Sequence, residues 1–524
     1  MEVDLRVLGC FAVAFVSIYL IYRRFRPPVN LPPGPRAWPV VGHLHMLGSL
    51  PHRSLDRLSK VYGPVMYLKL GSAPCVVGSS KDMASEFLKT NDLTFASRPR
   101  NAAGKYTVYN YSDITWSPYG DHWRRCRKIC LMELFSARRL ESYEYIRNEE
   151  VAAMIDSVFR TCRKGLPIHL REETYTVSNN IISRMVLGRR YLEENAGNKI
   201  EPQEFREMLE ELFVLNGVFD IGDYIPWLRW LDLQGYIRRM KAVNKRFDIF
   251  LEEVLEEHDR RRKSVPDYVP RDMVDVLLQQ SDDPELKLSR NRVKAFTQDM
   301  IAGGTESSAT LVEWGLAEML KKPEVFERAV EEMDRVVGRE RWMEEKDIAE
   351  MEYLQSIVKE TMRLHPVAPM LVPHMSTEPC KIGGYDIPAN TRLFVNVWTI
   401  GRDEKLWEKP EEFRPERFTG STLDVKGRDY ELLPFGSGRR MCPGAPLGLK
   451  VVQLGLANLI HGFRWWLPDN RSPERLDMTE TFGLSTPKAE PLVAMAEPRL
   501  PSRLYESTVA RKLDFQSDPM HILQ

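Results

Sequence analysis

One short loop limits what this chain can fold into: PFGSGRRMCPG, residues 434–444, which holds a single cysteine, Cys442. Its glycines allow the backbone to come close to something flat or bulky. The prolines at its end favour the first turn of a helix, and the apolar pattern of residues 448–463 predicts that this helix is buried. Backbone amides at a helix start and neighbouring arginines favour an anion. The loop is therefore suited to hold a thiolate.

A thiolate in a protein acts as a nucleophile or as a metal ligand. A nucleophilic Cys442 needs a partner base, and the loop contains neither a histidine nor a carboxylate. Ligation of iron agrees better with these residues. The chain has seven cysteines, an odd number, and no C-x-x-C pair, which indicates reduced thiols in a cytosolic environment.

The loop matches F-x-x-G-x-R-x-C-x-G and so resembles the haem-binding loop of the cytochromes P-450. Five positions carry this match: Phe435, Gly438, Arg440, Cys442 and Gly444. The resemblance covers nearly the whole chain, as far as FGLSTPK at residues 482–488, and it extends to plant endoplasmic-reticulum members of specialised metabolism. It implies a mainly α fold, with one helical domain and a small β-rich lobe. It also implies haem b, with Cys442 as the axial ligand of the iron and Phe435 beside the cofactor.

The segment AGGTESS, residues 302–308, lies within a long predicted helix over 293–322. Two adjacent glycines cost about 1 kcal/mol each in a helix interior, so they indicate either close helix packing or a groove over a flat cofactor. The resemblance implies that Glu306 and Ser307 are the acid–alcohol pair that relays protons during oxygen activation. Members of the family usually carry threonine where Ser307 stands.

The segment YLQSIVKETMRLHP, residues 353–366, predicts a helix that ends at its proline. Glu360 and Arg363 are three residues apart and so share one face of this helix. Alone, such a pair is a common surface ion pair. The resemblance implies that Arg417 of FRPERF joins it in a buried network, whose role is structural.

The segment HWRRCRKIC allows two interpretations. His122, Cys126 and Cys130 lie on one helical face, as in some zinc sites, but structural zinc needs four ligands and no fourth is evident. The resemblance instead implies a W-x-x-x-R motif, Trp123 and Arg127, whose arginine pairs with a haem propionate.

Further basic residues accompany this segment. The resemblance gives Arg440 a similar role to Arg127, and His374 stands where relatives often carry a propionate-binding arginine. A basic cluster near the cysteine is either a solvated surface or a docking site for an acidic redox partner. Its members are Arg124, Arg125, Lys128 and Arg439.

The N-terminal segment departs from a soluble profile. Residues 7–22 contain no charge and span about 24 Å as a helix, close to the thickness of a bilayer core. We expect a transmembrane anchor over residues 5–22, with the rest of the chain on the cytosolic side because RRFR follows. A cleaved signal peptide is the alternative, but no small-x-small cleavage site follows.

Domain boundaries follow from composition. A basic and proline-rich tether occupies residues 23–40, and PPVNLPPGPRAWP predicts stiff, extended backbone there. The haem domain spans 41–500, and a polar tail spans 501–524. Two short strands around a Gly-Ser turn are expected in GPVMYLKLGSAPCVVGSS, and an amphipathic helix over 246–263. Lysine plus arginine equals aspartate plus glutamate at 74 each, which argues against nucleic acid as a partner.

The resemblance implies monooxygenation of a small lipophilic plant metabolite, such as a phenolic, steroid or terpenoid, with O2 and NADPH. Electrons would come from a separate NADPH–cytochrome P-450 reductase, since the chain has no flavin or nucleotide module. We expect substrate contacts at Val367, Leu371 and Phe482, while Asn216 and Thr486 are candidates to orient a hydroxyl.

Three alternatives stay open. Oxidative C–C cleavage of a terpenoid alcohol to a homoterpene uses the same site. A haem isomerase or dehydratase would not need the acid–alcohol pair, and a non-catalytic haem-binding or scaffold protein would need neither this pair nor the thiolate. The expected location is the endoplasmic-reticulum membrane, single-pass, with the catalytic domain in the cytosol.

Overall fold

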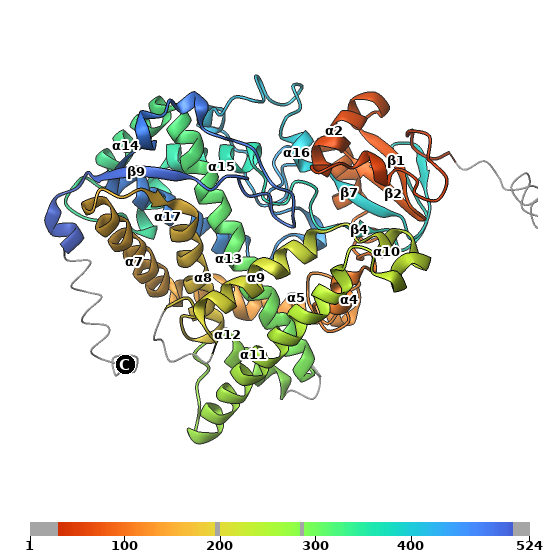
Figure 1. Ribbon diagram of the computed structural model, residues 1–524, viewed down its shortest axis with the longest axis horizontal. Helices are drawn as coiled ribbons and strands as arrows, with labels where there is room; N and C mark the ends of the chain where they lie inside the picture. The colour runs from red at the N-terminus through yellow and green to blue at the C-terminus, as the bar shows by residue number, and fades with distance from the viewer. Residues whose placement is uncertain (1–29, 194–199, 283–287, 507–524) are drawn as a thin grey trace, which may run out of the picture.

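The protein is described by a computed structural model, which covers residues 30–193, 200–282 and 288–506. Helices make up most of it, as predicted. The longest, α13 (Arg290–Lys321), crosses the centre of the molecule and packs chiefly against α8 (Leu170–Leu187) and α17 (Ala445–Gly462) (Figure 1). Most side chains of α13 and α17 are buried, so these helices form the core.

The remaining helices surround this core. The longer ones are α2 (Pro51–Tyr62), α7 (Glu144–Arg163), α9 (Pro202–Gly217), α11 (Tyr236–Ser264), α14 (Pro323–Val336) and α15 (Glu352–Leu364). The shorter ones are α3 (Lys81–Ser85), α4 (Ala102–Tyr106), α5 (Asp121–Ile129), α6 (Ala137–Ser142), α10 (Ile221–Tyr224), α12 (Met273–Ser281) and α16 (Val397–Ile400). A 3-10 helix, η4 (Pro226–Leu231), follows α10.

Three small sheets complete the fold. The largest has the order β1-β2-β7-β4 and lies with α2 and α16 at one end of the molecule, as Figure 1 shows at the right. In it β1 and β2 are antiparallel, β2 and β7 parallel, and β7 and β4 antiparallel. The other sheets have the orders β3-β9-β8 and β5-β6. The strands are β1 (Val65–Leu70), β2 (Ala73–Gly78), β3 (Ile168–His169), β4 (His374–Met375), β5 (Cys380–Ile382), β6 (Tyr385–Ile387), β7 (Arg392–Val395), β8 (Phe463–Trp466) and β9 (Val493–Pro498).

The predicted elements occur close to their expected positions. The helices expected over 293–322 and 353–366 are α13 and α15, and the buried helix expected over 448–463 is α17. The charged helix expected over 246–263 starts ten residues earlier, at Tyr236. The two strands around the Gly-Ser turn are β1 and β2. Helix α15 ends at Leu364 because a residue before proline disfavours helical backbone.

The two ends of the chain need separate comment. The anchor expected over residues 5–22 lies outside the described residues, and no helix within them is long and apolar enough to cross a membrane. At the other end, the polar tail expected from residue 501 begins with an attached turn. The side chain of Tyr505 is fully buried there, and its hydroxyl donates to the carbonyl of Gly462.

Candidate active site

A cavity lies between α13, α5 and the loop that carries Cys442. The wall is mainly apolar. Predicted site residues in it are Trp123, Arg127, Ser307, Val367, Leu371, His374, Phe435, Arg440 and Cys442.

The thiol of Cys442 faces this cavity, and its exposure is to the cavity rather than to the outer surface. Its backbone amide donates to the carbonyl of Phe435, at 2.9 Å. Burial raises the pKa of the thiol, whereas the amides of Gly444 and Ala445 and the cation of Arg127 lower it. The amides belong to the start of α17, so the helix stabilises negative charge on sulfur as the sequence predicted.

The shape of the loop depends on glycine at residue 438. This residue has φ of 67°, and a Cβ built there would lie 2.5 Å from the carbonyl oxygen of Leu88 and 2.6 Å from Asp92 Oδ1. A larger residue would push the loop away from the β-rich lobe. The close approach predicted for this loop is therefore to another part of the protein.

Four basic side chains gather in the cavity wall. Arg440 donates to the carbonyls of Ala96, Ile114 and Ser117 and stacks on Trp123, with its guanidinium carbon 4.4 Å from the ring centroid. The Arg127 side chain forms no hydrogen bond or ion pair with another described residue.

Arg98 is the third cation, and it is not among the site residues predicted from the sequence. Its guanidinium is buried and donates only to carbonyls, those of Thr115, Val372 and Pro373. Burial lowers the pKa of both Arg98 and Arg440. Because guanidinium groups keep their charge in proteins, an anion in the cavity would stabilise these buried cations. Arg98 stands directly before a proline in TFASRPR, and this local pattern alone does not distinguish it from other arginines.

His374 is buried in β4, with Nδ1 2.9 Å from the carbonyl oxygen of Phe95. A carbonyl only accepts, so Nδ1 carries the proton. Burial, followed by the charges of Arg98 and Arg440, lowers the pKa of His374 well below its usual value. An anion in the cavity would raise the pKa of His374.

The wall fits the haem implied by the sequence. The thiol of Cys442 stands on one side, beside amides and a cation that favour its charged form against the effect of burial. Basic groups that form no ion pair with another described residue stand at the edge. No aspartate or glutamate is among the described residues that line the cavity. Haem presents an iron and two carboxylates, which match these two features.

The adjacent glycines of α13 have different roles. A Cβ on Gly303 would meet no atom within 4 Å and would enter the cavity, whose wall this residue forms. A Cβ on Gly304 would lie 2.6 Å from Cγ1 and 2.8 Å from Cδ1 of Ile182 on α8. Gly304 therefore serves close helix packing, whereas Gly303 leaves space in the cavity, where a flat cofactor stays a prediction.

Glu306 and Ser307 do not point the same way. Ser307 lines the cavity, and its hydroxyl donates to the carbonyl of Gly303, at 2.8 Å. Glu306 is absent from the described wall and accepts a hydrogen bond from the hydroxyl of Ser485. Neighbours on a helix are about 100° apart, which explains the separation. Burial raises the pKa of Glu306, and the hydroxyl of Ser485 opposes this.

The predicted substrate contacts divide between two cavities. Val367 and Leu371 line the main cavity, and Leu371 has φ of 53°, an unusual value for leucine. Phe482 lines a second, smaller cavity, which shares Ala368 and Leu371 with the first.

Asn216 and Thr486, the candidates to orient a hydroxyl, both form hydrogen bonds within the protein, and Asn216 lines the second cavity. Asn216 accepts from Trp116 Nε1 at 2.7 Å and donates to the carbonyl of Leu212. The hydroxyl of Thr486 donates to the carbonyl of Pro366, at 2.9 Å. Both polar groups are used within the protein.

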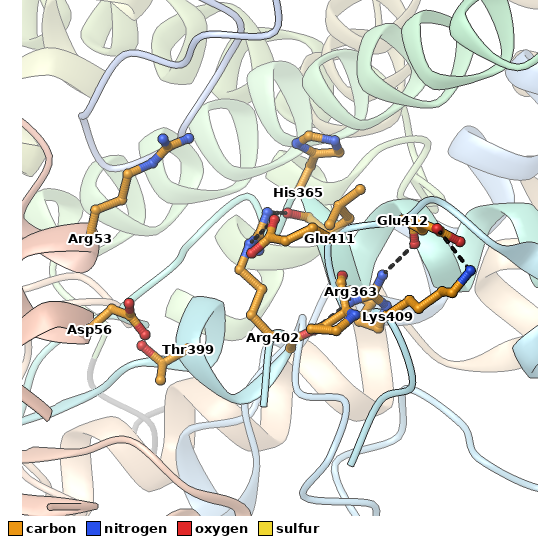
Figure 2. A network of polar contacts seen from close by, with 12 residues as sticks. Arg53, Asp56, Arg363, His365, Thr399, Arg402, Lys409, Glu411 and Glu412 are labelled. Carbon is orange, nitrogen blue, oxygen red and sulfur yellow. Dashed lines mark hydrogen bonds and ion pairs between the residues drawn. The ribbon is translucent and has the colours of Figure 1, made fainter. Parts of the chain in front are cut away.

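Glu360, Arg363 and Arg417 come together. Arg363 Nε and Nη2 lie 2.7 and 2.8 Å from the two carboxylate oxygens of Glu360, and Arg417 Nε lies 3.0 Å from one of them. The side chains of Glu360 and Arg363 are fully buried. Arg363 also donates to the carbonyl of Glu412, beside the ion pairs of Lys409 and Arg402 (Figure 2).

The predicted basic cluster is exposed but partly paired. Arg124 forms an ion pair with Asp121, and Arg439 forms one with Asp92. Lys128 is exposed, and Arg125 is half-buried.

The structure does not support zinc at this segment. His122 Nδ1 lies 3.6 Å from Cys126 Sγ, but among the described residues these two do not belong to a group of three ligand atoms close enough to hold a metal ion. Within the described residues, a possible metal-binding group occurs only at His258, Asp272 and Asp275. That group surrounds the guanidinium of Arg261, which already neutralises the carboxylates.

Comparisons with known proteins agree with this site. A family model described as cytochrome P450 matches residues 32–493. A trimethyltridecatetraene synthase from maize is 47% identical to this chain, over 94% of this chain and 93% of its own length. A dimethylnonatriene synthase from maize is 44% identical, over 97% of this chain and 99% of its own length. A flavonoid 3'-monooxygenase from Petunia hybrida is 40% identical over 96% of this chain and 100% of its own.

A solved structure of a zebrafish cytochrome P450 with abiraterone has a TM-score of 0.72 and 26% identity, and it covers 86% of this chain and 100% of its own. The family match spans every residue described above as a wall of the main cavity. The chain therefore belongs to the cytochrome P450 family.

Proposed function

We propose that the chain is a haem-thiolate monooxygenase that oxidises a small lipophilic plant metabolite. The observation that carries this proposal is the thiol of Cys442 at the start of α17, facing a cavity whose basic groups lack an anion. Haem ligated by a thiolate, when bound, activates O2 for insertion of one oxygen atom into an organic substrate. The name of the Petunia relative, a flavonoid 3'-monooxygenase, supports this reaction class.

In this proposal the chain's own groups hold the cofactor. Cys442 supplies the thiolate ligand, and the amides of Gly444 and Ala445 keep its charge stable. Arg98, Arg127 and Arg440 pair with the propionates. A nearby propionate would raise the pKa of His374, and the imidazole, once protonated from solvent, could donate to it from Nε2.

Glu306 and Ser307 move protons. Ser307 has the hydroxyl that reaches the cavity, and Glu306 is the acid that supplies it. Because their side chains diverge, Glu306 must change its side-chain rotamer or act through water to reach Ser307.

Electrons come from a separate NADPH–cytochrome P-450 reductase. Arg125 and Lys128 on α5 offer unpaired positive charge beside the segment that carries Trp123 and Arg127. An acidic partner docked there would lie on the Cys442 side of the cavity. Arg124 and Arg439 contribute less, because Asp121 and Asp92 offset their charges.

We place the enzyme on the endoplasmic-reticulum membrane, with residues 5–22 as anchor, 23–40 as tether, 41–500 as the catalytic domain and 501–524 as the tail. Exposed apolar side chains on two segments support membrane contact. Trp230 of η4 is 80% exposed, and Trp38 near the tether is 62% exposed. Both segments attach to the β1–β2 turn, since Gly71 donates to the carbonyl of Val41 and Ser72 to that of Tyr224. This face would lie against the lipid.

Oxidative cleavage of a terpenoid alcohol is a second candidate, favoured by one observation. Polar side chains of the second cavity are bonded within the protein: Asn216 accepts from Trp116, Asp223 accepts from the amide of Ala102, and Arg392 donates to the carbonyl of Asp223. A substrate there would be recognised by apolar contact and shape, which suits a terpenoid better than a polyhydroxylated flavonoid. The two maize relatives named for homoterpene synthesis agree with this.

The test is product analysis. Microsomes containing the full chain and a plant reductase receive NADPH with a panel of phenolics, sterols and terpenoid alcohols. Gain of one oxygen identifies a hydroxylase, and loss of a carbon fragment from a terpenoid alcohol identifies cleavage. Absence of NADPH consumption, with the haem-thiolate spectrum present, would contradict monooxygenation.

A further inference from the structure

Ser485 touches Glu306 from a segment far away in the sequence. Its hydroxyl donates to Glu306 Oε1, and its side chain is only 3% exposed. Ser485 lies one residue after Leu484 and three after Phe482, which both line the second cavity. One short loop therefore contacts both that cavity and the acid of α13.

This loop is anchored without the bond to Glu306. Thr486 donates from its backbone amide to the carbonyl of Val367 at 3.0 Å, and its hydroxyl bonds the carbonyl of Pro366. Trp314 Nε1 donates to the carbonyl of Thr486, also at 3.0 Å. Further along, Glu313 accepts from the amide of Leu492. The hydroxyl of Ser485 is not needed to hold the loop in place.

The bond instead acts on Glu306. The backbone of Glu306 is held within α13, but its side chain has rotatable bonds. The hydroxyl of Ser485 holds one of its two carboxylate oxygens. The other charged or titratable groups near it are Arg171 and Tyr175 on α8 and Glu210 on α9. Glu210 raises the pKa of Glu306, and Arg171 lowers it. A hydroxyl that donates to the carboxylate favours its charged form.

We propose that Ser485 is the positioning residue for Glu306, and that it connects proton delivery to the loop lining the second cavity. This inference rests on the proposed function of Glu306. A substrate in the second cavity touches residues 482–484, so it acts on the same loop that holds the acid. Proton supply then depends on whether a substrate is seated there.

The test compares Ser485→Ala with Thr486→Val in the full-length holoenzyme. Thr486→Val removes a buried hydroxyl that anchors the same loop to Pro366 and does not touch Glu306, while the backbone bonds of Thr486 to Val367 and Trp314 remain, so it is the matched control for any loosening of the loop. Ser485→Thr keeps a hydroxyl donor and should restore wild-type behaviour. The red-shifted Soret band of the reduced, CO-bound protein verifies an intact haem site in each variant.

Two measurements follow. The first is the infrared band of the protonated Glu306 carboxyl against pH, assigned by its loss in Glu306→Gln. Removal of a donor to the carboxylate raises the pKa, so the midpoint should rise by about one pH unit in Ser485→Ala and stay unchanged in Thr486→Val. The second is the share of NADPH electrons recovered as hydrogen peroxide with reductase present. It should increase several-fold in Ser485→Ala only.

The outcomes separate this inference from the proposed function. If Ser485→Ala leaves the infrared midpoint unchanged, or changes peroxide release no more than Thr486→Val does, Ser485 does not position Glu306. Ser485→Ala added to Glu306→Gln should have no further effect, and an additive loss would also overturn the inference. The wild-type chain could consume no NADPH while the infrared midpoint of Ser485→Ala still lies above that of the wild-type chain. In that case the proposed monooxygenation fails, and the role of Ser485 in positioning Glu306 stands.

Discussion

Substituting Gly304 by alanine tests whether α13 is held against α8 by the absence of a side chain. Alanine improves helix propensity by about 1 kcal/mol over glycine. Its Cβ, however, would lie 2.6 Å from Ile182 Cγ1 and 3.0 Å from Ile182 Cβ. The second atom belongs to the fixed part of the side chain, so a rotamer change alone cannot relieve the contact.

The size of the effect follows from a matched substitution one residue earlier. Gly303→Ala gains the same propensity, and its Cβ meets nothing within 4 Å. Inserting a methyl group into packed core costs about 1–3 kcal/mol. Since propensity cancels in the comparison, Gly304→Ala should be less stable than Gly303→Ala by about 1–3 kcal/mol.

Thermal unfolding of the solubilised full chain measures this difference. An unfolding entropy of about 2.1 cal/mol/K per residue makes 1 kcal/mol equal to about 1 °C in Tm for a chain of this length. Gly304→Ala should therefore melt about 1–3 °C below Gly303→Ala. Gly303→Ala should keep its stability but lose turnover, because its methyl group enters the cavity.

Ile182→Ala provides the decisive background. It removes the two closest atoms, Cγ1 and Cδ1, and leaves Cβ at 3.0 Å, so the penalty of Gly304→Ala should be smaller there, while Gly303→Ala is unaffected. Equal melting of the two glycine variants in the wild-type background would refute the packing argument. An undiminished penalty of Gly304→Ala in the Ile182→Ala background would also refute it.

Three further predictions concern other parts of the site. Cys442→Ala should abolish the red-shifted Soret band of the reduced, CO-bound protein; a variant that retains the band would mean that the ligand is misassigned. Glu360→Gln leaves the guanidinium groups of Arg363 and Arg417 without their carboxylate, so thermal unfolding should show a loss of about 3–5 kcal/mol in the free energy of unfolding. Glu412→Gln, at the exposed pair with Lys409, should lower it by less than about 0.5 kcal/mol. Lys128→Glu should slow turnover driven by reductase and spare turnover fed by peroxide, and equal loss in both assays would exclude a docking role.

Much of the fold could be predicted because its helices carry strong periodic and terminal signals. Pro366 indicated the end of α15 to within two residues, and the apolar pattern of residues 448–463 identified α17 as buried. The first two strands followed from the turn between them. These features depend on neighbours in sequence, and so they are readable from one chain.

The site was harder to predict, because it depends on segments that meet only after folding. Arg98 is held at the cavity wall by hydrogen bonds to three carbonyl groups from two other segments, and no local pattern indicates this. Ser485 was included in an apolar loop without a role, because its partner lies 179 residues away. Asn216 was chosen as a polar residue near the substrate, but Trp116 occupies its oxygen.

The anchoring of the loop over residues 482–488 has a consequence for how enzymes of this kind diverge. Ser485 and Thr486 are hydrogen-bonded to α13, and Thr486 is also hydrogen-bonded to Pro366, whereas residues 482–484 line the second cavity. Mutations in the first half of the loop can alter substrate choice without loosening the second half. Exchange of residues 482–484 between relatives is therefore the smallest graft expected to transfer selectivity, and a graft that includes Ser485 risks losing catalysis along with it.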